Sequence, residues 1–133
     1  MKFEKNSRDW RAAIDENLRT GFVELLILQL LTERDKYGYE LKKEISERTD
    51  GVMQFRESAL YIPLFRMASR GLVSSYKKTV VGKRFRTYYK IEEAGREYLE
   101  YGREQSFAVF SGVMKLFTQE ASGGDESSDE NEN

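Results

Sequence analysis

One segment constrains the fold of this chain more than any other, the run YKKTVVGKRFRTYYKI from Tyr76 to Ile91. After Gly82 the residues alternate between two faces, which is the pattern of a strand with one buried side. The predicted inner face consists of Phe85, Thr87, Tyr89 and Ile91. Because Gly82 tolerates the positive φ of a tight turn, we predict a two-stranded hairpin whose inner face joins the core.

The predicted hairpin is strongly basic, with six positive charges and no carboxylate. These charges belong to Lys77, Lys78, Lys83, Arg84, Arg86 and Lys90. Lysines on an exposed strand also protect it from edge-to-edge aggregation, which is the alternative interpretation. Both strands lack acids, and this favours a surface that contacts an anion.

The composition excludes several classes of protein. The chain has 133 residues, enough for one compact domain, and it contains neither Cys nor His. Disulfides, thiolate metal sites and the commonest general base are therefore absent. We expect no metal, no cofactor and no catalytic residue. An enzyme that uses Glu92, Glu93 or tyrosines is a much weaker alternative, because no convergent acid–base group is apparent.

The sequence also bears on location. Its first segment, MKFEKNSRDWR, is charged throughout and lacks the apolar region of a secretion signal. The apolar run from Phe22 to Leu31 contains Glu24 and Gln29 and is too short to cross a bilayer. We therefore expect a cytoplasmic protein with no membrane partner.

Three helices are predicted before residue 52. The first is capped by Ser7 and carries an apolar stripe of Trp10, Ile14 and Leu18. The run from Gly21 to Leu31 is apolar nearly all round, which is typical of a central, covered helix. The third helix places Tyr37, Leu41 and Ile45 on one face, and we expect it to end near Gly51, where glycine can adopt a left-handed conformation.

A further helix is predicted from Ser58, a plausible cap, to Ser69, with a core stripe of Leu60, Leu64 and Met67. Its outer face would expose Ile62 and Phe65. These side chains suit thymine methyls in a major groove, or equally well another chain or the N-terminal helix. In the first case Ser58, Tyr61 and Arg66 would bond to phosphates or base edges. Pro63 removes a helical hydrogen bond, so we expect the first turn to be bent or to begin late.

Helices followed by a basic hairpin predict a winged helix-turn-helix, a mainly α fold with a small β hairpin. We expect an N-terminal arm and short helix in residues 1–20, a winged helix-turn-helix DNA-binding domain in residues 21–91, and a C-terminal dimerisation helix in residues 92–119. The predicted DNA-binding residues are Ser58, Tyr61, Ile62, Phe65, Arg66, Lys77, Lys78, Lys83, Arg84 and Arg86.

The C-terminal segment can be judged from its own pattern. Between Glu92 and Phe117 apolar and small residues step by three or four, which gives one continuous stripe. A helix this apolar requires a partner, either the chain's own core or a second copy, and the small size of the domain favours a second copy. The residues predicted to dimerise are Leu99, Phe107, Phe110, Val113, Met114 and Phe117.

Residues 120–133 hold six carboxylates and no basic residue, whereas the preceding residues carry a net charge of +5 from 22 basic and 17 acidic side chains. Because this segment has almost no apolar residue to bury, we predict a disordered acidic tail. Its role is either to keep the protein soluble or to compete with nucleic acid for the basic wing.

Several motifs occur in one order between Gly21 and Leu99. They are GxxExxILxLL from Gly21, YGYEL from Tyr37, ALY from Ala59, RM from Arg66, GLV from Gly71 and RxYYxIxxxG from Arg86. As a set they resemble the PadR family of bacterial transcriptional regulators. Two positions depart from the usual pattern: Ile62 precedes Pro63, and Ala68 stands where an acidic residue is common.

The resemblance implies a homodimeric repressor that binds double-stranded operator DNA through the helix from Ser58 and the wing. It also implies that a small aromatic or amphipathic effector can release the DNA. For such an effector we predict a pocket of Trp10, Ile14, Phe107 and Phe110. The alternative is that Trp10 simply anchors its helix to a neighbouring helix and leaves no cavity. The alternative function is a protein adaptor that uses the exposed apolar face of Ile62 and Phe65.

Overall fold

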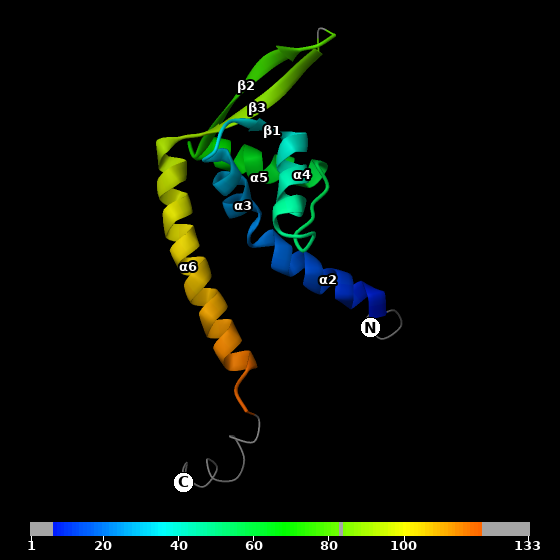
Figure 1. The fold of residues 1–133 in the computed structure, drawn as a ribbon, viewed down its shortest axis with the longest axis vertical. Helices are drawn as coiled ribbons and strands as arrows, with labels where there is room; N and C mark the ends of the chain where they lie inside the picture. Colours follow the sequence, from blue (N-terminus) through cyan, green and yellow to red (C-terminus); the bar gives the residue numbers. More distant parts are fainter. Residues whose placement is uncertain (1–6, 83, 121–133) are drawn as a thin grey trace. The chain divides into compact units, whose positions relative to one another are not determined.

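The protein is described by a computed structural model of residues 7–82 and 84–120. Lys83, the first six residues of the predicted arm and residues 121–133 of the predicted tail lie outside the described residues. The elements, shown in Figure 1, are α2 (Ser7–Thr20), α3 (Val23–Leu31), β1 (Lys36–Tyr37), α4 (Gly38–Arg48), α5 (Ser58–Ser69), β2 (Val73–Val80), β3 (Arg84–Ile91) and α6 (Glu93–Phe117).

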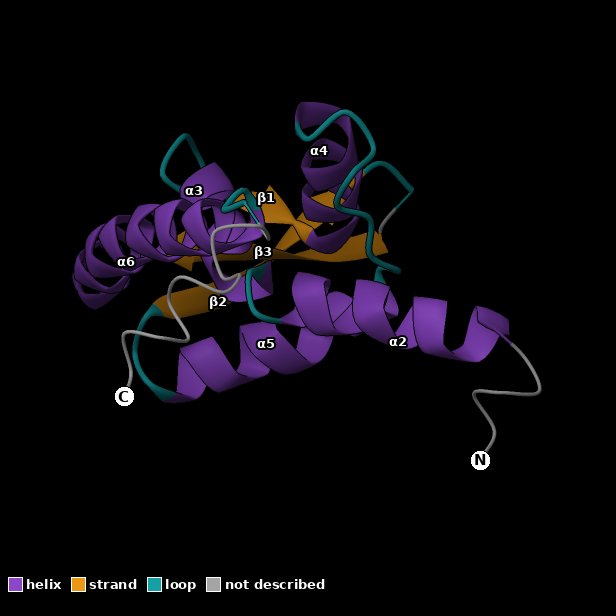
Figure 2. Cartoon of the chain, turned by 90° about the horizontal axis from the view of Figure 1, so that it is seen from below, coloured by secondary structure: helices purple, strands orange, loops and turns teal. Residues whose placement is uncertain are grey.

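The predicted fold class is confirmed, with one strand more than expected. The strands form an antiparallel sheet in the order β1-β3-β2, and helices make up most of the rest (Figure 2). β1 pairs Lys36 with Tyr89 and Tyr37 with Tyr88. A strand of two residues is too short for periodicity to reveal. Tyr37, which apolar spacing places in the following helix, instead precedes α4 as its N-cap.

The core gathers around α3, as its nearly uniform apolar sequence predicts. Five of its residues are buried, and α4, α5, the foot of the hairpin and the start of α6 complete the cluster. The predicted stripe of Leu60, Leu64 and Met67 is fully covered. After α4 the chain reverses through Asp50 and Gly51, both with positive φ, close to the predicted helix end.

The prediction for the inner face of the hairpin is wrong over its outer half. Ile91 is buried and Tyr89 packs against the core, but Phe85 remains 68% exposed. All eight residues of β2 pair with the eight residues of β3. The hairpin therefore reaches beyond the helices that cover its foot. Figure 1 shows its tip extending beyond α4 and α5. Burial at the foot and exposure at the tip are the expected properties of a wing.

Helix α5 begins at Ser58, so the expected late start is not observed. Pro63 lies inside the helix and is buried. The first turn is closed by hydrogen bonds between residues three apart in the sequence. The Ala59 amide donates to the Arg56 carbonyl and the Leu60 amide donates to the Glu57 carbonyl. The expectation that Ser58 caps the helix is also wrong, because Glu57 occupies the N-cap and no side chain caps the end.

Helix α6 crosses a boundary between two compact units, residues up to Glu100 and residues from Tyr101 onward. In the first unit the residue before α6 is bonded to the residue before β2, since the Glu92 amide donates to the Leu72 carbonyl at 2.9 Å. A β-carbon on Gly95 would lie 2.2 Å from that same carbonyl oxygen. Only glycine therefore permits this close approach of helix and strand.

Candidate nucleic-acid interface

The outer face of α5 is an exposed apolar surface of the first unit. Ile62 is 69% and Phe65 75% exposed, and Ser58 and Tyr61 lie on the open side with them. The Tyr61 hydroxyl donates to Glu57 Oε2 at 2.8 Å. This hydrogen bond to a carboxylate raises the pKa of Tyr61. An apolar face with a fixed hydroxyl beside it has the chemistry of a helix that reads base edges and thymine methyls.

Arg66, predicted to bond to phosphates or bases, is held within the chain. Its Nε donates to Glu24 Oε2 at 2.8 Å. The Tyr98 hydroxyl donates to the other oxygen of Glu24 at 2.6 Å, which raises the pKa of Tyr98. Glu24 thus connects α5 to the start of α6 and occupies the Nε of Arg66.

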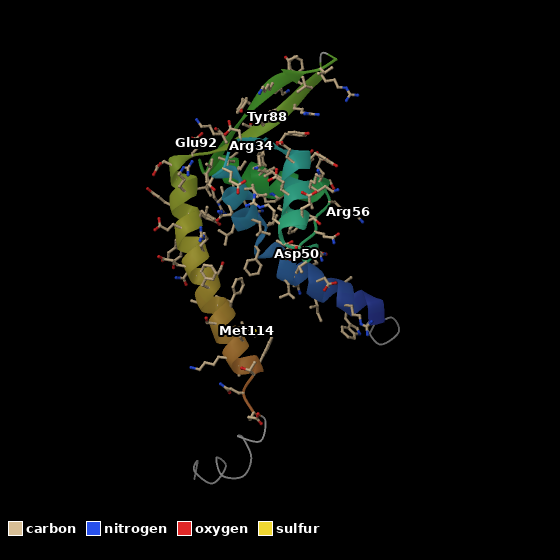
Figure 3. All side chains as sticks on the ribbon, viewed as in Figure 1. Arg34, Asp50, Arg56, Tyr88, Glu92 and Met114 are labelled. Atoms are coloured by element: carbon tan, nitrogen blue, oxygen red, sulfur yellow. The ribbon has the colours of Figure 1, made fainter. Side chains whose placement is uncertain are left out.

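A basic groove of about 950 Å³ runs beside α5. Its walls come from α2, the first residue of α3, α4, the loop before α5 and α5 itself. Besides Arg66, three further cations line it, Arg19, Lys42 and Arg56, together with one acid, Glu16. Figure 3 labels Arg56. Sequence patterns do not reveal these three cations, because they come from separate elements and only the fold brings them together.

The wing carries its cations on both faces. The register places Lys78 directly opposite Arg86 and Lys90 opposite Ser74 on the outer face. Like charges directly opposite one another destabilise a strand pair. Lys77 and Arg84 are also exposed. Repulsion between these cations makes the hairpin less stable. Such an arrangement is expected where an anionic partner neutralises the charges.

Three tyrosines form a cluster, the tyrosine row, at the foot of the wing: Tyr37 on β1, Tyr88 on β3 and Tyr76 on β2. The Tyr37 and Tyr88 ring centroids are 5.4 Å apart, and those of Tyr76 and Tyr88 are 5.8 Å apart. The Tyr76 hydroxyl donates to Asp35 Oδ2 at 2.7 Å, which raises the pKa of Tyr76. Tyr88 and the nearby Arg34 are labelled in Figure 3.

Beneath the wing, Lys36 is only 2% exposed and its charge is fully partnered. Its Nζ lies 2.9 Å from Glu44 Oε1 and 3.4 Å from Glu33 Oε1. Arg48 Nη2 approaches Glu33 Oε2 to 2.7 Å, and Arg34 Nη2 approaches Glu40 Oε2 to 2.9 Å. The hydrogen bond from Arg48 is the main reason that the pKa of Glu33 falls to about 2. These six side chains, the Lys36 network, fasten β1 to α4.

With this geometry established, we compared the chain with known proteins. A profile of the transcriptional regulator PadR-like family matches residues 27–101, more than half of the chain. The chain belongs to the PadR-like family. The resemblance inferred from the motifs is therefore confirmed, and so is the expectation of a DNA-binding transcriptional regulator rather than an enzyme.

Solved structures of PadR-like and related regulators share the fold. A transcriptional regulator from Clostridium thermocellum is 32% identical, with a TM-score of 0.68, over 77% of this chain and 96% of that one. A PadR family regulator from Eggerthella lenta is 26% identical, with a TM-score of 0.73, over 86% of this chain and 97% of that one. Bacillus subtilis PadR, solved in complex with operator DNA, is similar in fold at 19% identity and a TM-score of 0.54, over 58% of this chain and 44% of that one.

The PadR motifs correspond to the parts of this site. YGYEL covers Tyr37 of the tyrosine row and the first turn of α4, and RxYYxIxxxG covers β3 and Gly95. ALY lies in the first turn of α5, where Tyr61 is held by Glu57. The motifs therefore mark the junction of sheet, α4 and α5 rather than the exposed cations alone.

The second unit presents the apolar face predicted to dimerise. Phe107, Phe110, Val113, Met114 and Phe117 are all exposed on α6. Leu99 must be removed from this set, because it is 5% exposed and belongs to the core of its own chain. Tyr98 and Leu99 lie where α6 is still packed on α3, a contact that helical periodicity alone does not distinguish from a dimer interface.

The predicted effector residues occur in two separate groups. Trp10 and Ile14 are exposed on α2 in the first unit, while the rings of Phe107 and Phe110 meet edge to face at 6.4 Å in the second. The shared pocket remains a prediction. Within the described ranges, no helix is both long and apolar enough to cross a bilayer, and no group of three metal-ligating side chains is found.

Proposed function

We propose that this PadR-like regulator binds operator DNA as a homodimer, with α5 in the major groove and the wing on the phosphate backbone. One observation carries the proposal: the exposed face of α5 lies in the same compact unit as a basic groove beside it and a basic wing. Apolar contacts then choose the sequence, while the cations supply affinity that does not depend on sequence.

Each predicted residue has a role in this arrangement. Ile62 and Phe65 contact thymine methyls and sugars, and Ser58 and Tyr61 bond to base edges or phosphates. Arg66, whose Nε bonds to Glu24, joins them through its remaining guanidinium N–H groups. The wing contacts phosphates through Lys77, Lys78, Lys83, Arg84 and Arg86. To these we add Arg19, Lys42 and Arg56 of the basic groove, which are placed to follow the backbone that borders the major groove.

Dimerisation through α6 gives the regulator two DNA-binding domains. The exposed stripe of Phe107, Phe110, Val113, Met114 and Phe117 is too apolar for a helix that stands in water. A second copy covers it and positions two copies of α5 on two half-sites of an operator. A dimer that occupies an operator blocks access to it, so we propose repression. Such a protein acts in the cytoplasm, where bacterial DNA is found.

A planar aromatic ligand is the effector that this composition suits best. We propose that it stacks among Trp10, Ile14, Phe107 and Phe110 of the dimer. Trp10 is the only tryptophan in the chain, so its fluorescence reports binding directly. Titration with phenolic acids is expected to quench it saturably and to weaken DNA binding over the same concentration range, as linkage requires. Quenching without a change in DNA affinity would contradict a regulatory role.

The test of the main proposal begins by selecting fragments of the source genome that the purified protein binds. The change of both Ile62 and Phe65 to Ala is expected to weaken binding to a selected fragment about tenfold or more, with little effect on random DNA. Tyr101→Ala, an equally exposed change on α6, serves as the control. Equal losses on selected and random DNA would contradict sequence reading by α5.

The exposure of Ile62 and Phe65 also supports a second candidate, a protein adaptor. An adaptor would use these side chains as an apolar contact patch and would need no phosphate contacts. It would therefore show no salt-sensitive affinity for duplex DNA, whereas the regulator must. The same binding measurements thus separate the two functions.

A further inference from the structure

The tyrosine row lies beside two cations on neighbouring strands of the wing. Lys78 and Arg86 are directly opposite on the outer face of the wing. Arg86 Cζ lies 4.1 Å from the centroid of the Tyr37 ring, and Lys78 Nζ lies 5.4 Å from that of Tyr88. Each cation therefore has its own aromatic partner, Tyr37 for Arg86 and Tyr88 for Lys78. Both rings belong to the next pair of outward-facing positions towards the foot of the wing.

We propose that Tyr37 is a positioning residue of the DNA interface, which holds the Arg86 guanidinium in the orientation that meets a phosphate. The proposal rests on the proposed function, since it requires the wing to contact DNA. Tyr37 belongs to β1, outside the wing, and no contact between Tyr37 and DNA is needed.

The geometry explains how a stacked arginine can still bind an anion. A guanidinium is planar, and it stacks on a ring through its face while its N–H groups point outward in the plane. The register pairs Tyr37 with Tyr88, two residues beyond Arg86 on the same face of β3. Tyr37 is therefore the diagonal neighbour of Arg86, a distance that long side chains span.

The ring of Tyr37 packs against a neighbouring ring that is itself held in place. It meets Tyr88 at an interplanar angle of 60°, and Tyr88 stacks on Tyr76 at 15°. Asp35 holds the Tyr76 hydroxyl, and the Tyr37 amide donates to Glu40 Oε1 at 3.1 Å. The row is thus anchored both to the turn before β1 and to α4, so that it can hold a flexible side chain in place.

The tyrosine row counteracts the repulsion between Lys78 and Arg86. Without the rings, Lys78 and Arg86 would move apart, and each would lose conformational freedom on meeting DNA. Separate stacking on Tyr88 and Tyr37 keeps the two charges side by side before the partner arrives. Preorganisation of this kind increases affinity without adding a contact.

The test is a double-mutant cycle on duplex DNA, read by fluorescence anisotropy. Tyr37→Leu keeps every charge but removes the ring, and we expect about a three- to fivefold loss of affinity per wing. Tyr37→Phe keeps the ring and is expected to bind like the wild type. In an Arg86→Ala background, Tyr37→Leu is expected to have no further effect, because the ring acts through the arginine. Tyr101→Leu on α6 is the matched control.

A second measurement does not involve DNA. In the free protein, the Arg86 Nε–Hε resonance is expected to show a ring-current shift that Tyr37→Leu abolishes and Tyr37→Phe retains. Wild-type affinity in Tyr37→Leu, the same loss in Tyr37→Phe, or an undiminished loss in the Arg86→Ala background would each overturn the positioning role while leaving the proposed function intact. Absence of salt-sensitive DNA binding by the wild type would overturn both.

Discussion

Two adjacent residues, Lys36 and Tyr37, perform opposite tasks because strand geometry directs successive side chains to opposite faces. Lys36 points inward and is nearly inaccessible to solvent, with Glu33 and Glu44 as partners of its ammonium group. Tyr37 contacts Tyr88 and Arg86 on the outer face. A buried lysine without its carboxylates would be strongly destabilising, so both faces of β1 depend on the Lys36 network.

The first prediction concerns Glu33, whose carboxylate accepts hydrogen bonds from Arg48 and Lys36. Its pKa is lowered from 4.5 to about 2, mainly by the bond from Arg48. A lowered pKa in the folded state contributes stability above pH 4.5 that is lost as pH falls towards 2. Glu33→Gln is therefore expected to be less stable than the wild type at pH 7, with a difference that shrinks below about pH 4.5 and disappears near pH 2.

Urea unfolding followed by circular dichroism across this pH range measures the difference. Glu47→Gln is the control, since Glu47 is exposed and its oxygen lies 3.6 Å from Lys43, outside the Lys36 network. A Glu33→Gln difference that stays constant from neutral pH down to the lowered pKa of about 2 would contradict the assignment.

At the scale of elements, periodicity identified the long segments and failed on the short one. The α5 stripe and the basic hairpin were predicted because the pattern of apolar residues repeats along elements of eight or more residues. β1 was missed because two residues have no period. The outer half of the hairpin was predicted to be buried because alternation reports which side chains share a face, but not whether another element covers that face.

Gly95 provides a test of how α6 is attached to the sheet. A β-carbon there would lie 2.2 Å from the Leu72 carbonyl oxygen and 2.9 Å from Ile91 Cγ1. Backbone cannot move away as a flexible side chain can, so Gly95→Ala is expected to lower the free energy of unfolding by about 2 kcal/mol or more. Thermal and urea unfolding report this loss.

Gly112→Ala is the matched control on the same helix, because a β-carbon at that position would meet no atom within 4 Å. In a helix interior this change is expected to be neutral or to stabilise by up to about 1 kcal/mol. Opposite signs for the two glycines support the close approach at Leu72. Equal effects would show that α6 is not held there.

At the scale of the whole molecule, the candidate site was predictable in part. The basic wing and the outer face of α5 follow from local patterns, whereas the groove cations Arg19, Lys42 and Arg56 come together only in the fold. Local patterns also assigned two residues to surfaces although they have contacts inside their own chain. Leu99 packs in the core, and Arg66 bonds to Glu24.

Assembly is tested on the exposed stripe of α6. Replacement of Phe110 and Phe117 by Asp would bury charge in the proposed interface, so the variant is expected to sediment as a monomer. With one half-site engaged at a time, its operator affinity is expected to fall about a hundredfold. Ala108→Asp, which lies on the opposite side of the helix, is expected to sediment and bind like the wild type. A wild type that is already monomeric at micromolar concentration would contradict the dimer.

Phosphate binding by the cations of the wing is tested by the salt dependence of binding to a selected operator fragment. A dimer that neutralises on the order of 6 to 10 phosphates gives a slope of log affinity against log salt of about −5 to −9. Changing Lys83, Arg84 and Arg86 together to Ala is expected to flatten this slope by about one unit for each phosphate that the variant no longer neutralises. Lys115→Ala on α6 is expected to leave it unchanged. A folded triple variant that keeps the wild-type slope would contradict the claim and exclude the wing from the interface.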